Sequence, residues 1–137
     1  MRLSPSFRFA LYGAFAMLFA TGVGWLVADS LKDGSDGEIW QETAADLLML
    51  HGGAAMVTLM LLGGLVPTHI ERAWRMKRNQ VSGAIMATFN ATLIATSFGL
   101  YYLGSETLRP WISDGHIGIG LLLPVLFVVH VLRGRRS

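Results

Sequence analysis

The chain contains four histidines and no cysteine, and the histidines lie near the ends of two long apolar segments. His51 and His69 flank one segment, and His116 and His130 flank the other. Imidazole is the commonest metal ligand in proteins, and ionisable side chains inside apolar segments are rare and usually functional. The absence of cysteine excludes thiol nucleophiles, iron–sulfur clusters and thioether-linked cofactors. The histidines are therefore the residues best suited to chemistry, as metal ligands.

The spacing of the histidines predicts that each pair shares one helix face. His69 follows His51 by 18 positions, which is about five whole α-helical turns. His130 follows His116 by 14 positions, which is about 40° short of four turns. The two members of a pair are then roughly 21 to 27 Å apart along the axis, most of the thickness of a bilayer's hydrocarbon core. Each segment therefore carries one histidine near each membrane surface.

Composition predicts an all-α membrane protein. Of the residues, 53% are hydrophobic and 15% are charged, against roughly 25% charged in soluble domains. The first apolar run resembles a signal peptide, but at about 20 residues it exceeds the usual 7–15, so we expect it to be retained as a helix. We predict one integral membrane domain (residues 1–137), a four-transmembrane-helix bundle of up-down-up-down topology, with spans at about 9–28, 45–68, 81–103 and 112–132.

Charge predicts the orientation of these spans. One side of the membrane would hold nine basic residues and a single acid, Glu71; the basic residues are Arg2, Arg8, Arg72, Arg75, Lys77, Arg78, Arg133, Arg135 and Arg136. The other side would hold two basic and eight acidic residues: Lys32, Arg109, Asp29, Asp33, Asp36, Glu38, Glu42, Asp46, Glu106 and Asp114. Because lysine and arginine favour the cytoplasm, both termini are expected there. Topology explains the basic clusters, so no nucleic acid is expected as a partner.

Orientation pairs the histidines between helices. The second and fourth spans would run in the same direction, which brings His51 level with His116 on the outer side and His69 level with His130 on the inner side. Two histidines per site, about 20 Å or more from the next pair, suit the axial positions of haem iron better than zinc, which takes three or four ligands. Copper stays open as an alternative by ligand type, and the seven methionines favour it.

Small and basic residues complete the expected sites. A flat macrocycle between helices needs room, and Gly52 beside His51 and the roughly co-facial Gly13 and Gly24 of the first span can provide it. Arg72 near the inner site and Arg109 near the outer site are candidates to contact haem propionates. A purely topological role explains these arginines equally well.

With these residues the chain resembles the di-haem four-helix b-type membrane cytochromes, the cytochrome b subunits of membrane-bound redox complexes. In that family two helices carry paired histidines, often 13 or 14 residues apart. The segment HIGIGLLLPVLFVVH matches this spacing with His116 and His130, whereas HGGAAMVTLMLLGGLVPTH separates His51 and His69 by 18. Tilt or a kink at Pro67 must absorb the extra turn, so His69 is the least secure ligand.

The resemblance implies two bis-histidine haem b groups, or one at minimum, that carry electrons across a cytoplasmic (inner) membrane. It implies an electron-transfer subunit rather than a complete enzyme, with membrane lipid and other subunits of a respiratory or quinone-linked complex as partners. A quinone or quinol site and a soluble electron carrier at the acidic outer face are further expectations, although no residue identifies them. The competing interpretations are a single-haem cytochrome, a non-redox scaffold or assembly subunit with interfacial histidines, and a metal transporter.

Overall fold

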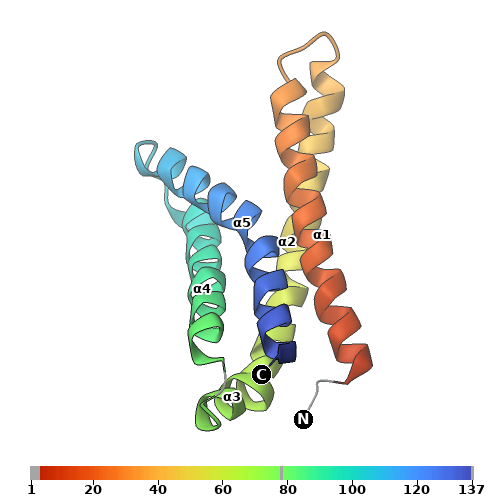
Figure 1. Ribbon diagram of the computed structural model, residues 1–137. Coiled ribbons are helices and arrows are strands. Elements are labelled where there is room, and N and C mark those ends of the chain that lie inside the picture. Colours follow the sequence, from red (N-terminus) through yellow and green to blue (C-terminus); the bar gives the residue numbers. More distant parts are fainter. Residues whose placement is uncertain (1–3, 78, 137) are drawn as a thin grey trace. The chain divides into compact units, whose positions relative to one another are not determined.

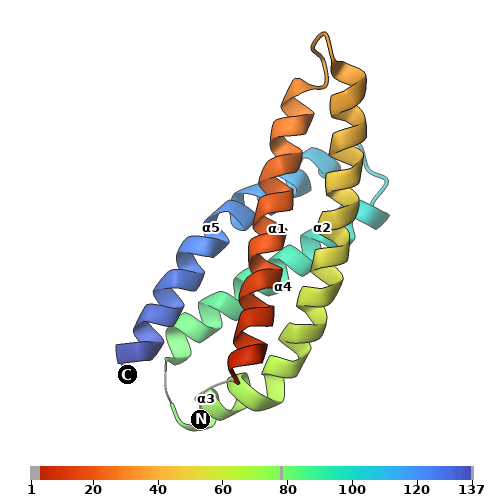
Figure 2. The same ribbon diagram turned by 90° about the vertical axis from the view of Figure 1, so that its right-hand side faces the viewer.

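The computed structural model describes residues 4–77 and 79–136, and every element within these ranges is helical. The elements in chain order are the helices α1 (Pro5–Leu31) and α2 (Gly37–Leu65), the π-helix η1 (Val66–Ile70), and the helices α3 (Glu71–Arg75), α4 (Gln80–Tyr102) and α5 (Leu108–Arg136) (Figure 1). The chain divides after His69 into two units, which we name hairpin 1 (Met1–His69) and hairpin 2 (Ile70–Ser137). In hairpin 1, α1 and α2 run side by side in opposite directions (Figure 2). In hairpin 2, α4 and α5 do the same.

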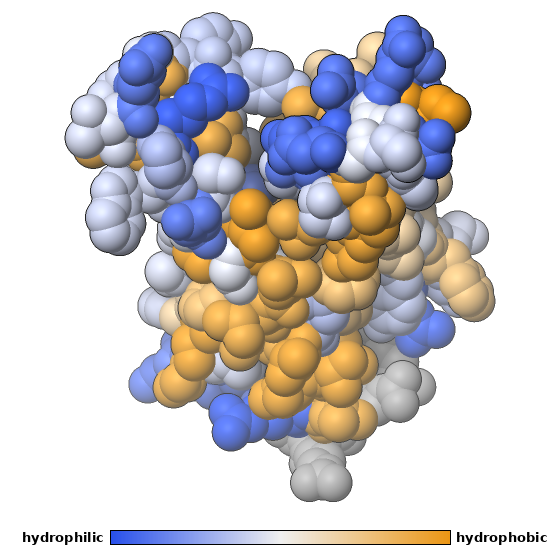
Figure 3. All heavy atoms as spheres, turned by 90° about the horizontal axis from the view of Figure 1, so that it is seen from above, coloured by the Kyte–Doolittle hydropathy of each residue, from blue (hydrophilic) through white to orange (hydrophobic). Residues whose placement is uncertain are grey.

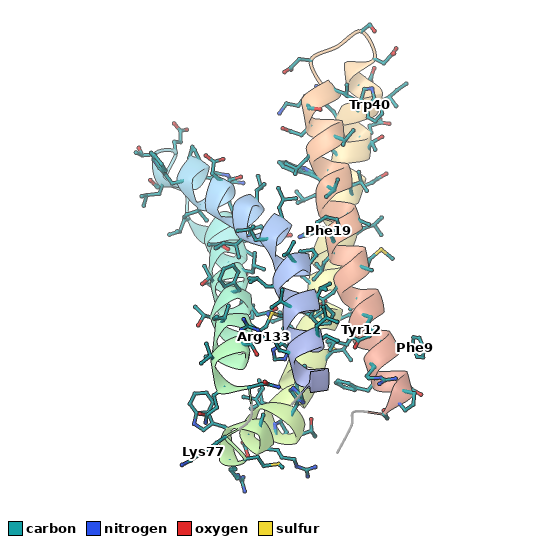
Figure 4. All side chains as sticks on the ribbon, in the orientation of Figure 1. Phe9, Tyr12, Phe19, Trp40, Lys77 and Arg133 are labelled. Atoms are coloured by element: carbon teal, nitrogen blue, oxygen red, sulfur yellow. The ribbon has the colours of Figure 1, made fainter. Side chains whose placement is uncertain are left out.

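Four helices are long and apolar enough to cross a membrane, which confirms the predicted all-helical, multi-pass architecture. These candidate spans are Pro5–Leu31, Gly37–Arg75, Gln80–Tyr102 and Leu108–Gly134. All of them except Gln80–Tyr102 extend beyond the predicted spans at both ends, because polar residues continue each helix past its apolar part. Large apolar side chains are exposed along the helices (Figure 3). Phe9, for example, is 73% exposed and points away from hairpin 1 (Figure 4), as a lipid-facing side chain does.

The tight turn at the acidic end of hairpin 1 depends on glycine. The amide of Gly34 donates to the carbonyl of Leu31, and the amide of Gly37 donates to the carbonyl of Gly34. A Cβ atom on Gly37 would collide with the Lys32 carbonyl, so only glycine allows this approach. The short turn places α2 antiparallel to α1, and this direction sets which residues of the two helices are level.

Buried residues in hairpin 1 recur every seven positions along both helices, as they do where two helices pack side by side. On α1 these are Ala14, Thr21 and Ala28, with Leu11 also buried three positions before Ala14; on α2 they are Ala44, Thr58 and Leu65, with the half-buried His51 midway between Ala44 and Thr58. We call this line of contact the seam of hairpin 1. Most of its residues are small, which permits close approach of two membrane helices. His51 lies on the same seven-residue line of α2 and is half-buried.

The distortion expected at Pro67 takes the form of the π-helix η1. Proline has no amide hydrogen and its ring crowds the carbonyl four residues earlier, here that of Gly63. The amide of Val66 donates to the Gly63 carbonyl instead. The side chain of Thr68 donates to the Gly64 carbonyl at 2.7 Å, which satisfies an acceptor that the regular ladder would have used. The helix therefore continues through Pro67, but with altered registration.

Within hairpin 2, α4 follows a turn in which Lys77 and Asn79 both adopt left-handed backbone angles, with φ of 51° and 49°. Its seam also repeats every seven residues, with Ser82, Phe89 and Thr96 on α4 and His116, Leu123 and His130 on α5. Pro124 lies inside α5, and this helix bends along its length (Figure 1). An interior proline removes a helical hydrogen bond and is an established cause of such a bend.

Candidate functional site

His51 is held against α1 by a threonine and a glycine. Its Nδ1 atom lies 3.0 Å from Oγ1 of Thr21, a residue that is only 4% exposed. The backbone of Leu18, one turn before Gly22 on α1, also lies beside the His51 ring. A Cβ atom on Gly22 would lie 3.3 Å from Cε1 of the imidazole, so glycine at this position leaves room for the ring. The side chain of His51 is therefore held in the seam of hairpin 1 and does not point into lipid.

Both histidines of hairpin 2 are held in the same way by hydroxyl groups of α4. Nδ1 of His116 lies 2.8 Å from Oγ1 of Thr96, and Nδ1 of His130 lies 3.1 Å from Oγ of Ser82. These two contacts are 14 positions apart on each helix and occupy one seam. The expectation that His116 and His130 share a face of one helix agrees with this arrangement, because both face α4.

His69 differs from the other three histidines. It lies within η1 and is exposed. A π-helical turn takes more residues than an α-helical turn, so the count of five whole turns from His51 to His69, which assumed an unbroken α-helix, does not apply. The seam position of α2 that lies 14 residues after His51 is occupied instead by buried Leu65.

The candidate glycines occupy different surroundings. Gly24 packs against Leu47 of α2, since a Cβ atom on it would lie 3.3 Å from Cδ1 of that leucine. A Cβ atom on Gly13 would meet nothing within 4 Å. Gly52 follows His51 on α2 and is half-buried. Gly24 thus serves the contact between α1 and α2, whereas the space beside Gly13 is open.

The candidate arginines are exposed at helix ends. Arg72 lies on the short helix α3, and Arg109 lies in the first turn of α5. Among the other charged residues of the predicted orientation, Arg2 and Arg78 lie outside the described residues, as do the side chains of Arg135 and Arg136.

A local ion pair occupies the acidic end of hairpin 1. The Asp29 carboxylate accepts a hydrogen bond from Nζ of Lys32 at 2.8 Å, and this bond raises the pKa of Lys32 above its ordinary value. The attraction of Asp29, and to a smaller extent that of Asp33, acts in the same direction.

Four residues that hold the histidines were not predicted from the sequence: Thr21, Gly22, Ser82 and Thr96. A signal for three of them is present in the sequence. Thr21 and His51 are equidistant from residue 36, and both hydroxyl–histidine pairs of hairpin 2 are equidistant from residue 106. Positions placed symmetrically about a short turn become level in an antiparallel hairpin, so the hydroxyl residues opposite His51, His116 and His130 were identifiable from the sequence.

Comparison of the chain with protein-family models, with curated proteins and with solved structures finds no match. Within residues 4–77 and 79–136, no three side chains of His, Asp or Glu come together in a group that could hold a metal ion. What the chain can do must therefore be argued from its own residues.

Proposed function

We propose that the protein is a b-type membrane cytochrome that carries electrons across the bilayer through two bis-histidine haems. One observation carries this proposal: His51, His116 and His130 each meet a hydroxyl group of the neighbouring helix at Nδ1. Histidines that bind metal through one ring nitrogen almost always engage the other with a hydrogen-bonding partner. Interfacial histidines need no such arrangement within a helical seam.

The residues present fit haem. Imidazole is an established ligand of haem iron, and each of the three seam histidines meets a hydroxyl group at Nδ1, so Nε2 would be the nitrogen that binds the metal. His51 and His116 would hold the outer haem, and His69 and His130 the inner one. When bound, haem supplies reversible one-electron chemistry, and its potential depends on its ligands, burial and nearby charge. With two histidines for each iron, the chain's role would be to hold these ligands in place and to exclude other molecules from the metal.

The remaining residues support a transmembrane electron path. Gly13, with open space beside it, and Gly52, which follows His51 in the sequence, would provide room for the haems. Arg72 and Arg109 lie at helix ends, where they would contact propionates on the inner and outer sides. By the asymmetry of basic residues, we place the protein in the cytoplasmic membrane with both termini in the cytoplasm. Other subunits of a respiratory or quinone-linked complex would supply and remove electrons, and the acidic outer end would receive a basic carrier.

The absorption spectrum of the purified protein tests this proposal. We expect a reducible haem spectrum with a sharp α-band, and about two haem b groups per chain by the pyridine haemochrome assay. The double variant His51→Ala/His116→Ala should lose the outer haem and keep the inner one. A colourless preparation from cells supplied with haem would overturn the proposal.

A single-haem cytochrome is the second candidate, and the position of His69 favours it. This histidine is exposed in a π-helical turn, while the corresponding seam position holds Leu65. A value of about one haem per chain that His69→Ala does not change would select this candidate.

A further inference from the structure

The hydroxyl group of Thr21 has one proton, and the backbone of α1 already accepts it. Oγ1 lies 2.7 Å from the carbonyl oxygen of Met17 and 3.2 Å from that of Leu18, and carbonyls can only accept. With its proton directed there, Oγ1 presents lone pairs to Nδ1 of His51 at 3.0 Å. The contact is then a hydrogen bond only if Nδ1 carries the hydrogen.

Thr96 repeats this arrangement in hairpin 2. Its Oγ1 donates to the carbonyl of Thr92 at 2.8 Å, with the Leu93 carbonyl at 3.1 Å, and lies 2.8 Å from Nδ1 of His116. Ser82 repeats the arrangement with longer distances: among the described residues its hydroxyl donates to the carbonyl of Asn79 at 3.3 Å, and it lies 3.1 Å from Nδ1 of His130. The two threonines therefore orient their hydroxyl groups more firmly than the serine does.

We propose that Thr21 and Thr96, and more weakly Ser82, are positioning residues that select the Nδ1–H tautomer of the histidine opposite them. A neutral imidazole carries one ring hydrogen, so a hydrogen on Nδ1 leaves Nε2 as the nitrogen with a lone pair for a metal. This inference rests on the proposed function for its purpose, because selection of Nε2 prepares the ligand before haem arrives. The tautomer itself is a property of the haem-free chain.

Thr58 shows that helix packing alone does not require the histidine contact. It is a buried threonine in the seam of hairpin 1, 4% exposed, and its hydroxyl donates to the carbonyl of Ala54 at 2.8 Å. Thr58 therefore shares the burial and the backbone bond of Thr21 and has no histidine across the seam. It provides a matched control on the helix that carries His51.

Nitrogen NMR of the haem-free, full-length protein in detergent micelles, labelled with nitrogen-15 at histidine, tests the inference. Protonated and unprotonated ring nitrogens have well-separated shifts, so each tautomer is read directly. We expect the Nδ1–H form for His51 and His116, and a smaller excess of it for His130. Thr21→Val should convert His51 to the Nε2–H form without changing His116, Thr21→Ser should retain the wild-type form, and Thr58→Val should change neither histidine.

An Nε2–H form for His51 and His116 in the wild type would overturn the inference, and this measurement does not depend on any variant folding. An unchanged His51 tautomer in Thr21→Val would also overturn it. Haem titration separates the two proposals: Thr21→Val should weaken haem binding by roughly 10- to 100-fold, the usual effect of losing such a partner. If the tautomers are as expected but the wild type binds no haem, the proposed function fails and the positioning role stands.

Discussion

At the level of Thr21 and of Thr96, hairpin 1 and hairpin 2 contain the same arrangement. In each, a threonine of the first helix donates to its own backbone and meets Nδ1 of a histidine on the second helix. One seven-residue step further along the seam the hairpins already differ, with small Ala14 level with Thr58 in one and large Phe89 level with Leu123 in the other. The threonine–histidine level, which the proposed orientation makes the outer one, is thus built alike in two helix pairs whose packing is otherwise different.

The two hairpins differ completely at the level of Ser82 and His130, which the proposed orientation makes the inner one. Hairpin 2 places Ser82 opposite His130, whereas the same seam positions of hairpin 1 hold Phe7 and Leu65. The ring of Phe7 packs on Gly64, 3.6 Å from where a Cβ atom would stand. An apolar layer therefore replaces the hydroxyl–histidine pair, and the second histidine of hairpin 1 lies four residues beyond it. The difference teaches that hairpin 2 holds two histidines in its seam by hydroxyl contacts, whereas hairpin 1 holds one.

The two inner histidines should respond unequally to removal, which is the largest effect we expect. His130→Ala removes the ligand fixed in the seam, so the haem content should fall from about two to about one per chain. His69→Ala removes the exposed ligand in η1, so the inner haem should stay bound to His130 with a five-coordinate, high-spin spectrum. Pyridine haemochrome and absorption spectra check both variants, with Met60→Ala as a control at a 77% exposed position of α2. Complete loss of the inner haem in His69→Ala alone would reverse the comparison.

The π-helix gives hairpin 1 a second distinctive property, which Pro67→Ala tests. Alanine restores the amide that proline lacks and removes its clash, so we expect an unbroken α-helix and a gain in stability of up to about 3 kcal/mol. Rotation of His69 away from its present position should at the same time weaken the inner haem. Thermal unfolding should show the gain in stability, and haem titration should show the loss of affinity for the inner haem. Pro124→Ala is the control, because Pro124 is the interior proline of the bent helix α5. His116 and His130, on either side of it, both keep their contacts to the same face of α4.

If Pro67→Ala leaves inner-haem affinity unchanged while stability rises, η1 is only a packing defect. The contrast between a regular inner level in hairpin 2 and a distorted one in hairpin 1 would then have no functional content.

The sequence was sufficient for the features that depend on periodicity and composition. The four helices follow from apolar length, and the shared face of His116 and His130 follows from a 14-residue spacing in a helix that stays α-helical throughout. The same counting was insufficient for His51 and His69, because a hydrogen-bonding change around Pro67 alters the number of residues per turn and no residue type specifies that form of distortion. The contacts at Nδ1 were not predicted because counting along a single helix does not find them. They depend on the antiparallel register of two helices, which the two short turns determine.

The smallest effect we expect comes from adding a single methyl group next to His51. At this level both hairpins have a threonine–histidine contact, but the residue after the threonine differs. Gly22 lies beside the ring of His51, and the corresponding position after Thr96 is Ser97. In Gly22→Ala the new Cβ atom would stand 3.3 Å from Cε1, so the ring must move by a few tenths of an ångström. We expect a modest shift in the midpoint potential of the outer haem in redox titration, with the inner haem unaffected. Gly53→Ala, whose Cβ atom would meet nothing within 4 Å, should stabilise α2 by up to about 1 kcal/mol and leave both potentials unchanged. Equal potentials in Gly22→Ala and the wild type would mean that the fit of His51 against α1 does not determine the potential of the outer haem. Hairpin 1 would then tolerate a less closely packed histidine at the outer level, as it already does with the exposed His69 at the inner level.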